Sequence, residues 1–269
     1  MLRSLKDLEH YTVQASDGDI GNVVNFLLDD DRWTVRYLVV DTGSFLEGRH
    51  VLVSPISFRT VDEATQRFHV DLTRAKVKNS PSVEVDKPVS RQHERDYLRY
   101  YGYSSYWGYS GVWGLGAYPG LLMGAMPSRP PADAQPEPPG DAHLRSVNEL
   151  HGYHIQGSDE AIGHVEDFVV DDETWTIRYL VVDTRNWWFG KKVLVAPHWA
   201  SRISYADRKV QIDLSRETIK NSPEWDGNAR IDRDYETRLH GYYGLPAYWA
   251  SGDPTAASSA GRAGYVAQL

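Results

Sequence analysis

The sequence contains no cysteine. This absence excludes disulfide bonds, thiolate catalysis and cysteine-based zinc sites. A second absence is an apolar leader, because residues 1–7 lack the hydrophobic core of a signal peptide. We therefore expect a cytoplasmic protein, and leave open a peripheral association with the inner membrane.

Basic residues are in the minority. The 269-residue chain has a formal net charge of −8 and a pI near 5.7, whereas a dedicated nucleic-acid binder presents a basic patch. We therefore expect no nucleic-acid partner. The hydrophobic fraction of 41% and the charged fraction of 25% are typical of a soluble globular protein, and the length suits two domains.

Patterns that carry chemistry are also missing. Residues 29–31 are three aspartates, but they lack the alternation and the glycine of a calcium loop, so we interpret them as a solvated hairpin tip. His151 and His154 are not spaced as ligands on a helix. No phosphate-binding glycine loop and no nucleophile elbow is present. We expect no enzyme activity, no cofactor and no metal site.

One stretch of the sequence occurs twice. Residues 33–41 recur as residues 175–183 with a single change, Val35 to Ile177. The stretch is rich in β-branched and aromatic residues and contains no glycine or proline, which predicts a central strand covered on both faces.

The repeated stretch belongs to a duplicated domain. Leu2-Arg3-Ser4 recurs 142 residues later as Leu144-Arg145-Ser146, and the offset holds to Pro81 and Pro223. Short strands separated by turn residues predict an all-β fold of two tandem small β-barrels. In the first copy we expect strands at 11–15, 21–28, 33–41, 50–53, 58–61 and 67–71, and a short helix between Thr73 and Pro81.

An aromatic tail follows each barrel. It ends in Tyr106-Trp107 in the first copy and in Tyr248-Trp249 in the second. We predict a short helix in each tail, ending at Gly102 and at Gly241, and we expect the rings to cover the open end of a barrel.

These features predict four segments. They are a first barrel with its tail at 1–107, a Gly- and Pro-rich linker at 108–143, a second barrel with its tail at 144–250, and a flexible C-terminal tail at 251–269. We expect the barrels to fold independently. The uncharged run 100–128 is long enough to span a bilayer, but its many glycines favour a linker or a partner-binding segment.

The two copies share an ordered set of motifs. They are Ile20-Gly21-x-Val23, Asp29 to Asp31, Arg36 to Asp41, Gly48 and Val51-Leu52-Val53-x-Pro55, with Ile162-Gly163-x-Val165, Asp171-Asp172, Arg178 to Asp183, Gly190 and Val193-Leu194-Val195-x-Pro197. This ordered set resembles the PRC-barrel domain family, which includes the cytoplasmic domain of the photosynthetic reaction-centre H subunit and the C-terminal domain of the ribosome-maturation factor RimM. The resemblance implies a small β-barrel used as a binding or assembly module.

We therefore expect a non-enzymatic protein that mediates protein–protein interaction or assembly. The resemblance leaves two alternatives open, a membrane-associated factor of photosynthetic light reactions and an RNA- or ribosome-associated factor. The identity of the protein partner and the oligomeric state are not predicted by the sequence.

One loop is the candidate partner-binding site. Three adjacent rings, Trp187, Trp188 and Phe189, precede Lys191 and Lys192. Aromatic residues beside cations are typical of binding hot spots. The alternative is that the rings close their own barrel or pack on the other one, because large rings usually bury their area internally.

Overall fold

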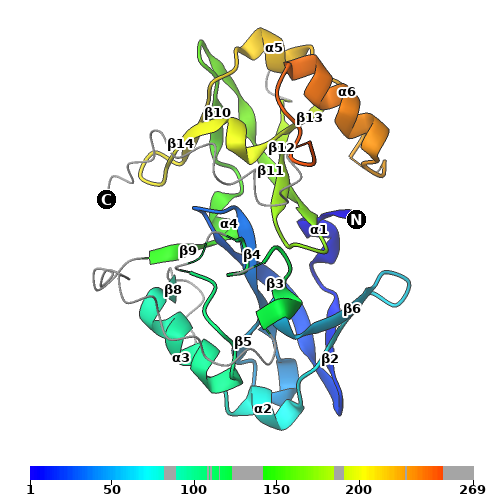
Figure 1. The fold of residues 1–269 in the computed structure, drawn as a ribbon, viewed down its shortest axis with the longest axis vertical. Coiled ribbons are helices and arrows are strands. Elements are labelled where there is room, and N and C mark those ends of the chain that lie inside the picture. Colours follow the sequence, from blue (N-terminus) through cyan, green and yellow to red (C-terminus); the bar gives the residue numbers. More distant parts are fainter. Residues whose placement is uncertain are drawn as a thin grey trace. The chain divides into compact units, whose positions relative to one another are not determined.

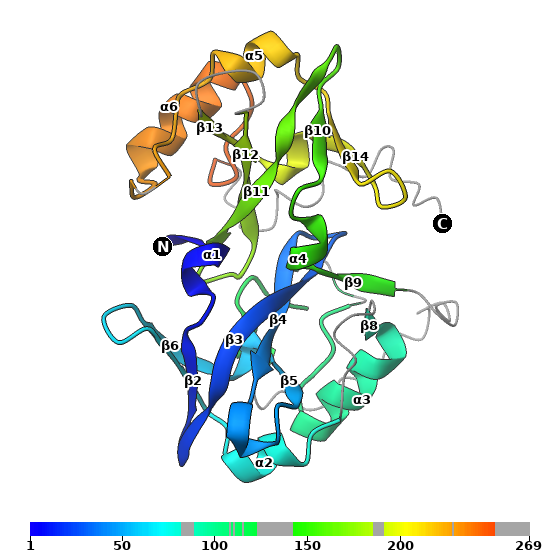
Figure 2. The ribbon, with the colours of Figure 1, turned by 180° about the vertical axis from the view of Figure 1, so that it is seen from behind.

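The computed structural model describes residues 1–81, 89–107, 109, 111–114, 116–122, 142–184, 191–227 and 229–250. The chain divides into two compact units, each described here by itself (Figures 1 and 2). The first-repeat unit comprises Asp7–Glu149 and Glu173–Trp175. The second-repeat unit comprises Met1–Lys6, Leu150–Asp172 and Thr176–Leu269.

The first-repeat unit contains an eight-stranded mixed sheet. Its strand order is β5-β4-β3-β2-β7-β6, and β9 pairs with both β3 and β8. The pairing of β2 with β7 is parallel and the other pairings are antiparallel. The strands are β2 (Thr12–Ala15), β3 (Gly18–Asp29), β4 (Thr34–Asp41), β5 (His50–Val53), β6 (Phe58–Asp62), β7 (Arg67–Val70), β8 (Val89–Ser90) and β9 (Ala142–Ser146).

The second-repeat unit contains a seven-stranded mixed sheet with the corresponding order. The order is β13-β12-β11-β10-β15-β14, and β1 pairs with β11. Two mixed sheets confirm the all-β expectation. The strands are β1 (Leu2–Ser4), β10 (His154–Gln156), β11 (Ala161–Asp171), β12 (Ile177–Asp183), β13 (Lys192–Val195), β14 (Ala200–Ser204) and β15 (Lys209–Ile212).

The helices are few and short. Thr73 caps α2, as expected, by accepting the Lys76 N–H at 3.2 Å. The helix of the first tail ends before the left-handed Gly102, but that of the second continues through Gly241 to the left-handed Gly244. The helices are α1 (Leu5–Leu8), α2 (Arg74–Lys78), α3 (Arg91–Tyr101), α4 (Val147–Leu150), α5 (Arg216–Lys220) and α6 (Arg233–Tyr243), with 3-10 turns η1 (Gly43–Phe45), η2 (Pro55–Ser57), η3 (Pro119–Leu122) and η4 (Pro197–Trp199).

The first strand of each repeat belongs to the unit of the other repeat. In the second-repeat unit Ser4 of β1 pairs with Val169, and its hydroxyl donates to Asp167 at 2.5 Å. In the first-repeat unit Ser146 of β9 accepts the Asn25 side-chain amide at 2.8 Å. Each sheet is therefore completed by a strand from the other sequence repeat.

The repeated stretch forms the buried centre of each sheet, as its composition predicted. Every residue of β12 is buried, as is β4 up to Val40. The tryptophan that begins the stretch differs from the expectation, because Trp33 and Trp175 lie before the strands with positive φ values of 50° and 57°. Trp175 belongs to the first-repeat unit, where its ring lies 4.9 Å from that of Phe58.

The acidic hairpin of the first repeat is not a solvated tip. Asp29 and Asp30 are 2% and 8% exposed, and Asp31 alone of the three is exposed. Asp29 accepts a 2.9 Å hydrogen bond from the buried Arg36 guanidinium. The sequence interpretation was wrong because a buried cation on the adjacent strand β4, Arg36, compensates the buried carboxylate.

A second buried network joins α3 to the sheet. Glu94 accepts hydrogen bonds from the hydroxyls of Tyr37 at 2.9 Å and Tyr106 at 2.8 Å. The Arg36 guanidinium lies 3.7 Å from the Tyr106 ring centroid. Burial raises the pKa of Tyr37 and of Tyr106 well above the usual value, so both hydroxyls stay protonated donors.

The described part of the chain includes no helix that is both long enough and apolar enough to cross a membrane.

Candidate functional site

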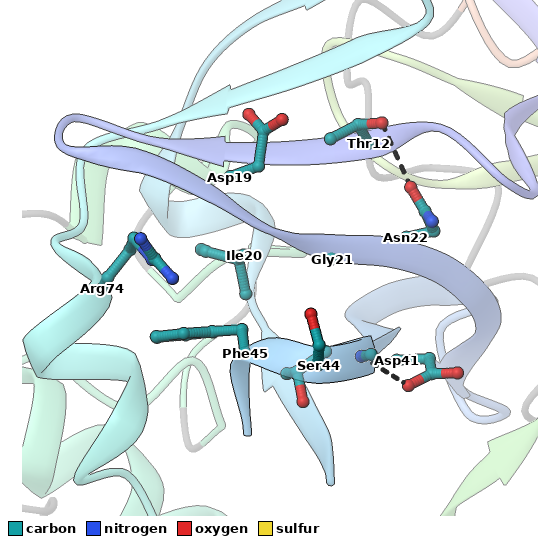
Figure 3. A pocket seen from close by; sticks show the side chains of 11 residues that line it. Thr12, Asp19, Ile20, Gly21, Asn22, Asp41, Ser44, Phe45 and Arg74 are labelled. Atoms are coloured by element: carbon teal, nitrogen blue, oxygen red, sulfur yellow. Dashed lines mark hydrogen bonds between the residues drawn. The ribbon is translucent and has the colours of Figure 1, made fainter. Parts of the chain in front are cut away.

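An open groove of about 670 Å³ lies in the first-repeat unit (Figure 3). Strands β2 and β3 form one side of it, and the turn η1 and the first residue of α2 complete it. Most of its lining is polar. The lining residues are Thr12, Asp19, Ile20, Gly21, Asn22, Asp41, Thr42, Gly43, Ser44, Phe45 and Arg74.

The shape of the groove depends on close packing between β3 and β4. A Cβ added to Gly21 would lie 1.9 Å from the Asp41 carbonyl oxygen, so only glycine allows the approach. Gly163 occupies the same place in the second repeat, 2.1 Å from the Asp183 oxygen on the same construction. The glycine of the repeated Ile-Gly motif is therefore a packing residue.

The turn η1 is fixed by hydrogen bonds to its own flanks. The Gly43 N–H donates to the Asp41 carboxylate at 2.9 Å. The Thr42 hydroxyl donates to the Arg49 carbonyl at 2.7 Å, across the base of the loop. Phe45 and Ser44 are thereby held at the groove.

Two other polar contacts lie along the β2–β3 side. The Thr12 hydroxyl donates to the Asn22 side-chain oxygen at 3.1 Å, drawn as a dashed line in Figure 3. Asp19 forms a 2.7 Å ion pair with Arg67. Both charges of that pair are substantially exposed, so it contributes little to stability.

Arg74 is the basic residue of the groove. Its Cζ lies 4.1 Å from the Phe45 ring centroid, and Figure 3 shows both side chains beside Ile20. Its backbone N–H donates to Asp17 at 2.8 Å. Its Nε is buried without a hydrogen-bond acceptor.

By sequence offset, the predicted partner-binding loop of the second repeat aligns with the turn η1 that lines this groove in the first repeat. Trp187 stands 142 residues after Phe45. Trp187, Trp188 and Phe189 lie outside the described residues. The expectation about these three rings therefore stays a prediction.

The two lysines of the predicted site are described, and both are engaged within their own unit. Lys191 Nζ donates to the carbonyls of Lys220 at 2.8 Å and Ser222 at 2.7 Å, at the end of α5. Lys192 Nζ lies 2.9 Å from the Glu166 carboxylate. In the first repeat Arg49 donates likewise to the Lys78 carbonyl at 3.0 Å, so the Lys191 position fixes a helix end.

His151 and His154, which the sequence analysis considered as metal ligands, make other contacts. The His151 ring packs at 5.8 Å from that of Phe168, and His154 is exposed on β10. Among the described residues, no group of three or more His, Cys, Asp or Glu side chains is placed to hold a metal ion.

Sequence reasoning did not find the groove, because its residues come from separate segments and form no motif. One signal was present. At the fixed offset Gly18 aligns with Glu160 and Phe45 with Trp187, so the repeats differ at two positions that in the first repeat lie beside Arg74.

Comparison with protein families gives one match. A model of the PRC-barrel domain matches residues 2–77 and again residues 143–219. These two segments together cover more than half of the chain and coincide with the two sequence repeats. No curated protein matches the chain.

Proposed function

The chain belongs to the PRC-barrel domain family, and we propose that it is a non-enzymatic protein-interaction or assembly module. In this proposal each mixed sheet closes as a small barrel, and a protein partner binds at the loop that follows the central strand. That loop carries Phe45 in the first repeat and Trp187 in the second.

The observation that supports the proposal is the groove of the first-repeat unit. Its polar groups come from three strands, a turn and a helix, and Phe45 supplies an apolar surface beside Arg74. An aromatic ring next to a cation is the combination enriched in interaction hot spots. The polar lining suits hydrogen bonds to the backbone of a bound segment.

The buried charges have a different role. Asp29, Arg36 and Glu94 are each bound by neighbours inside the first-repeat unit. These residues are part of the fold, so the charges that support binding are those at the surface of the groove.

Affinity purification of the full chain from its native host tests the proposal. We expect a defined partner to co-purify with the wild type. Replacing Trp187, Trp188 and Phe189 together by Ser, or Phe45 by Ser, should reduce recovery of that partner while the β-sheet spectrum is retained.

Tyr242→Ser is the matched control, because Tyr242 is an exposed aromatic residue (41%) outside both loops and outside the run 100–128. It should leave recovery of the partner unchanged. If both loop variants bind the partner like the wild type, the loops are not the interaction site. If no partner is enriched over an untagged strain, the interaction role itself is wrong.

A further inference from the structure

The guanidinium of Arg74 is held in place but has no anionic partner. It stacks on Phe45, and within the described part of the chain no hydrogen bond or ion pair is made by its side chain. Its buried Nε lacks an acceptor, as does the Nε of Arg216, so the difference between the two arginines lies in their anionic partners. The contact with Phe45 orients the planar group, so little entropy is lost when it binds an anion.

In the second repeat the corresponding arginine has an anionic partner. Arg216 stands at the corresponding position, and its backbone N–H donates to Asp159 at 2.8 Å as that of Arg74 donates to Asp17. Its guanidinium is ion-paired with the carboxylate of Glu160. The ligand of this arginine in the second repeat is therefore a glutamate side chain.

In the first repeat that glutamate is replaced by Gly18. Gly18 has φ +137°, and a Cβ built on it would lie 3.3 Å from Cδ of Arg74. The neighbouring acid, Asp19, is engaged by Arg67 at 2.7 Å. The first repeat thus keeps the arginine and lacks the carboxylate that pairs with it in the second.

We infer that the groove binds an acidic side chain of a partner protein, with the carboxylate on Arg74 where the Glu160 carboxylate lies on Arg216. The inference rests on the proposed interaction role and names the chemistry of the partner. The groove, at about 670 Å³, has room for a peptide segment beyond the carboxylate.

The groove also sets the direction of the segment. Asp41 lies across the groove from Arg74, with Ser44 and Phe45 between them (Figure 3). A carboxylate near Asp41 is repelled, whereas backbone N–H groups or a lysine are attracted. The acidic residue of the segment therefore points to Arg74, and its polar or basic flank lies towards Asp41.

The test uses a capped pentapeptide with one central glutamate, titrated into the full ¹⁵N-labelled chain. The Nε–H signal of Arg74, assigned by its loss in Arg74→Lys, reports binding directly. We expect it to shift saturably. The matched peptide with a central glutamine should bind at least about fivefold more weakly, because the charge-assisted hydrogen bonds are lost.

Two variants separate the site from general charge effects. Arg74→Gln should abolish the peptide-induced shifts in the groove, whereas Arg216→Gln should leave them unchanged, because Arg216 is already paired with Glu160. Retained binding in Arg74→Gln, with an unchanged circular dichroism spectrum, overturns the inference.

Other anions distinguish the source of the carboxylate. Acetate should shift the Arg74 signal only at much higher concentration than the peptide does. Equal potency of acetate overturns the peptide assignment in favour of a small carboxylate. Tighter binding of inorganic phosphate overturns it in favour of a phosphate ligand.

The inference and the proposed function can fail separately. If the native partner is recovered equally by the wild type and Arg74→Gln, the carboxylate assignment is wrong and the interaction role stands. If no partner is recovered by the wild type but the glutamate peptide binds, the interaction role is wrong and the anion site stands.

Discussion

The imidazole rings of His198 and His240 stack with their centroids 6.4 Å apart and their planes 13° apart. They stand 142 residues after Ile56 and Leu98, which are buried apolar residues of the first repeat. An apolar pair in one repeat is thus a histidine pair in the other.

The histidine pair predicts that the free energy of unfolding decreases as the pH is lowered. Burial, with a smaller contribution from His240, lowers the pKa of His198 from 6.5 to about 4, and burial lowers that of His240. Below pH 6.5 the unfolded chain binds protons that the folded chain does not, so the free energy of unfolding decreases down to about pH 4. The loss for His198 is on the order of 3 kcal/mol.

The neighbours of the pair act in both directions, because backbone hydrogen bonds at Leu245 and Pro246 raise the pKa of His240 against the larger effect of burial. Arg178 disfavours protonation of His198, and Arg233 disfavours protonation of His240. The Tyr179 hydroxyl lies 3.1 Å from His240 Nε2. Urea unfolding at pH 7.5 and pH 4.5 should show a smaller pH dependence in His198→Ile/His240→Leu, and an equal dependence in variant and wild type would refute the assignment.

The buried pair of Arg36 and Asp29 predicts non-additive mutations. Arg36→Met leaves the Asp29 carboxylate buried beside an apolar group and should cost about 3–5 kcal/mol of stability. Asp29→Asn in the same chain removes that charge, so the double variant should recover part of the loss. A double variant as unstable as the sum of the single variants contradicts the model of a compensated pair.

Gly21 predicts a steric effect at the floor of the groove. Gly21→Ala places a methyl group against the Asp41 carbonyl and should cost about 1–3 kcal/mol or more. Gly43→Ala is the control, since a Cβ there meets no atom within 4 Å and only its φ of +50° is unfavourable. The urea midpoint should fall further for Gly21→Ala, and the reverse order would show that the strands separate easily.

The exchanged strands predict that the repeats depend on each other. If the chain is cut in the Pro-rich run at 127–140, β1 stays with the first fragment and β9 with the second, although each completes the other unit's sheet. We expect the two fragments to elute together in gel filtration. Two stable fragments that elute separately would instead support barrels that fold independently.

The local sequence determined the strands, the turns and the caps. The repeated stretch at 33–41 has the composition of a strand covered on both faces. Thr73 and Gly102 are residue types that favour helix caps through their own side chain or backbone, independently of distant contacts. The duplication was equally visible, because the offset of 142 residues needs no structure to be measured. These features depend on neighbours in the chain, so the sequence alone predicts them.

Tertiary structure decided which strands complete which sheet and which charges are buried. The strands Leu2–Ser4 and Ala142–Ser146 have the same Leu-Arg-Ser sequence. Each completes the sheet of the other repeat because it pairs with a strand more than a hundred residues away. The sequence predicted that Asp29 is exposed, but its carboxylate is buried, because Arg36 compensates its charge. Arg74 and Arg216 occupy equivalent positions, and the fold shows that Arg216 forms an ion pair with Glu160, whereas no described side chain forms one with Arg74, because such a pair is a contact across space.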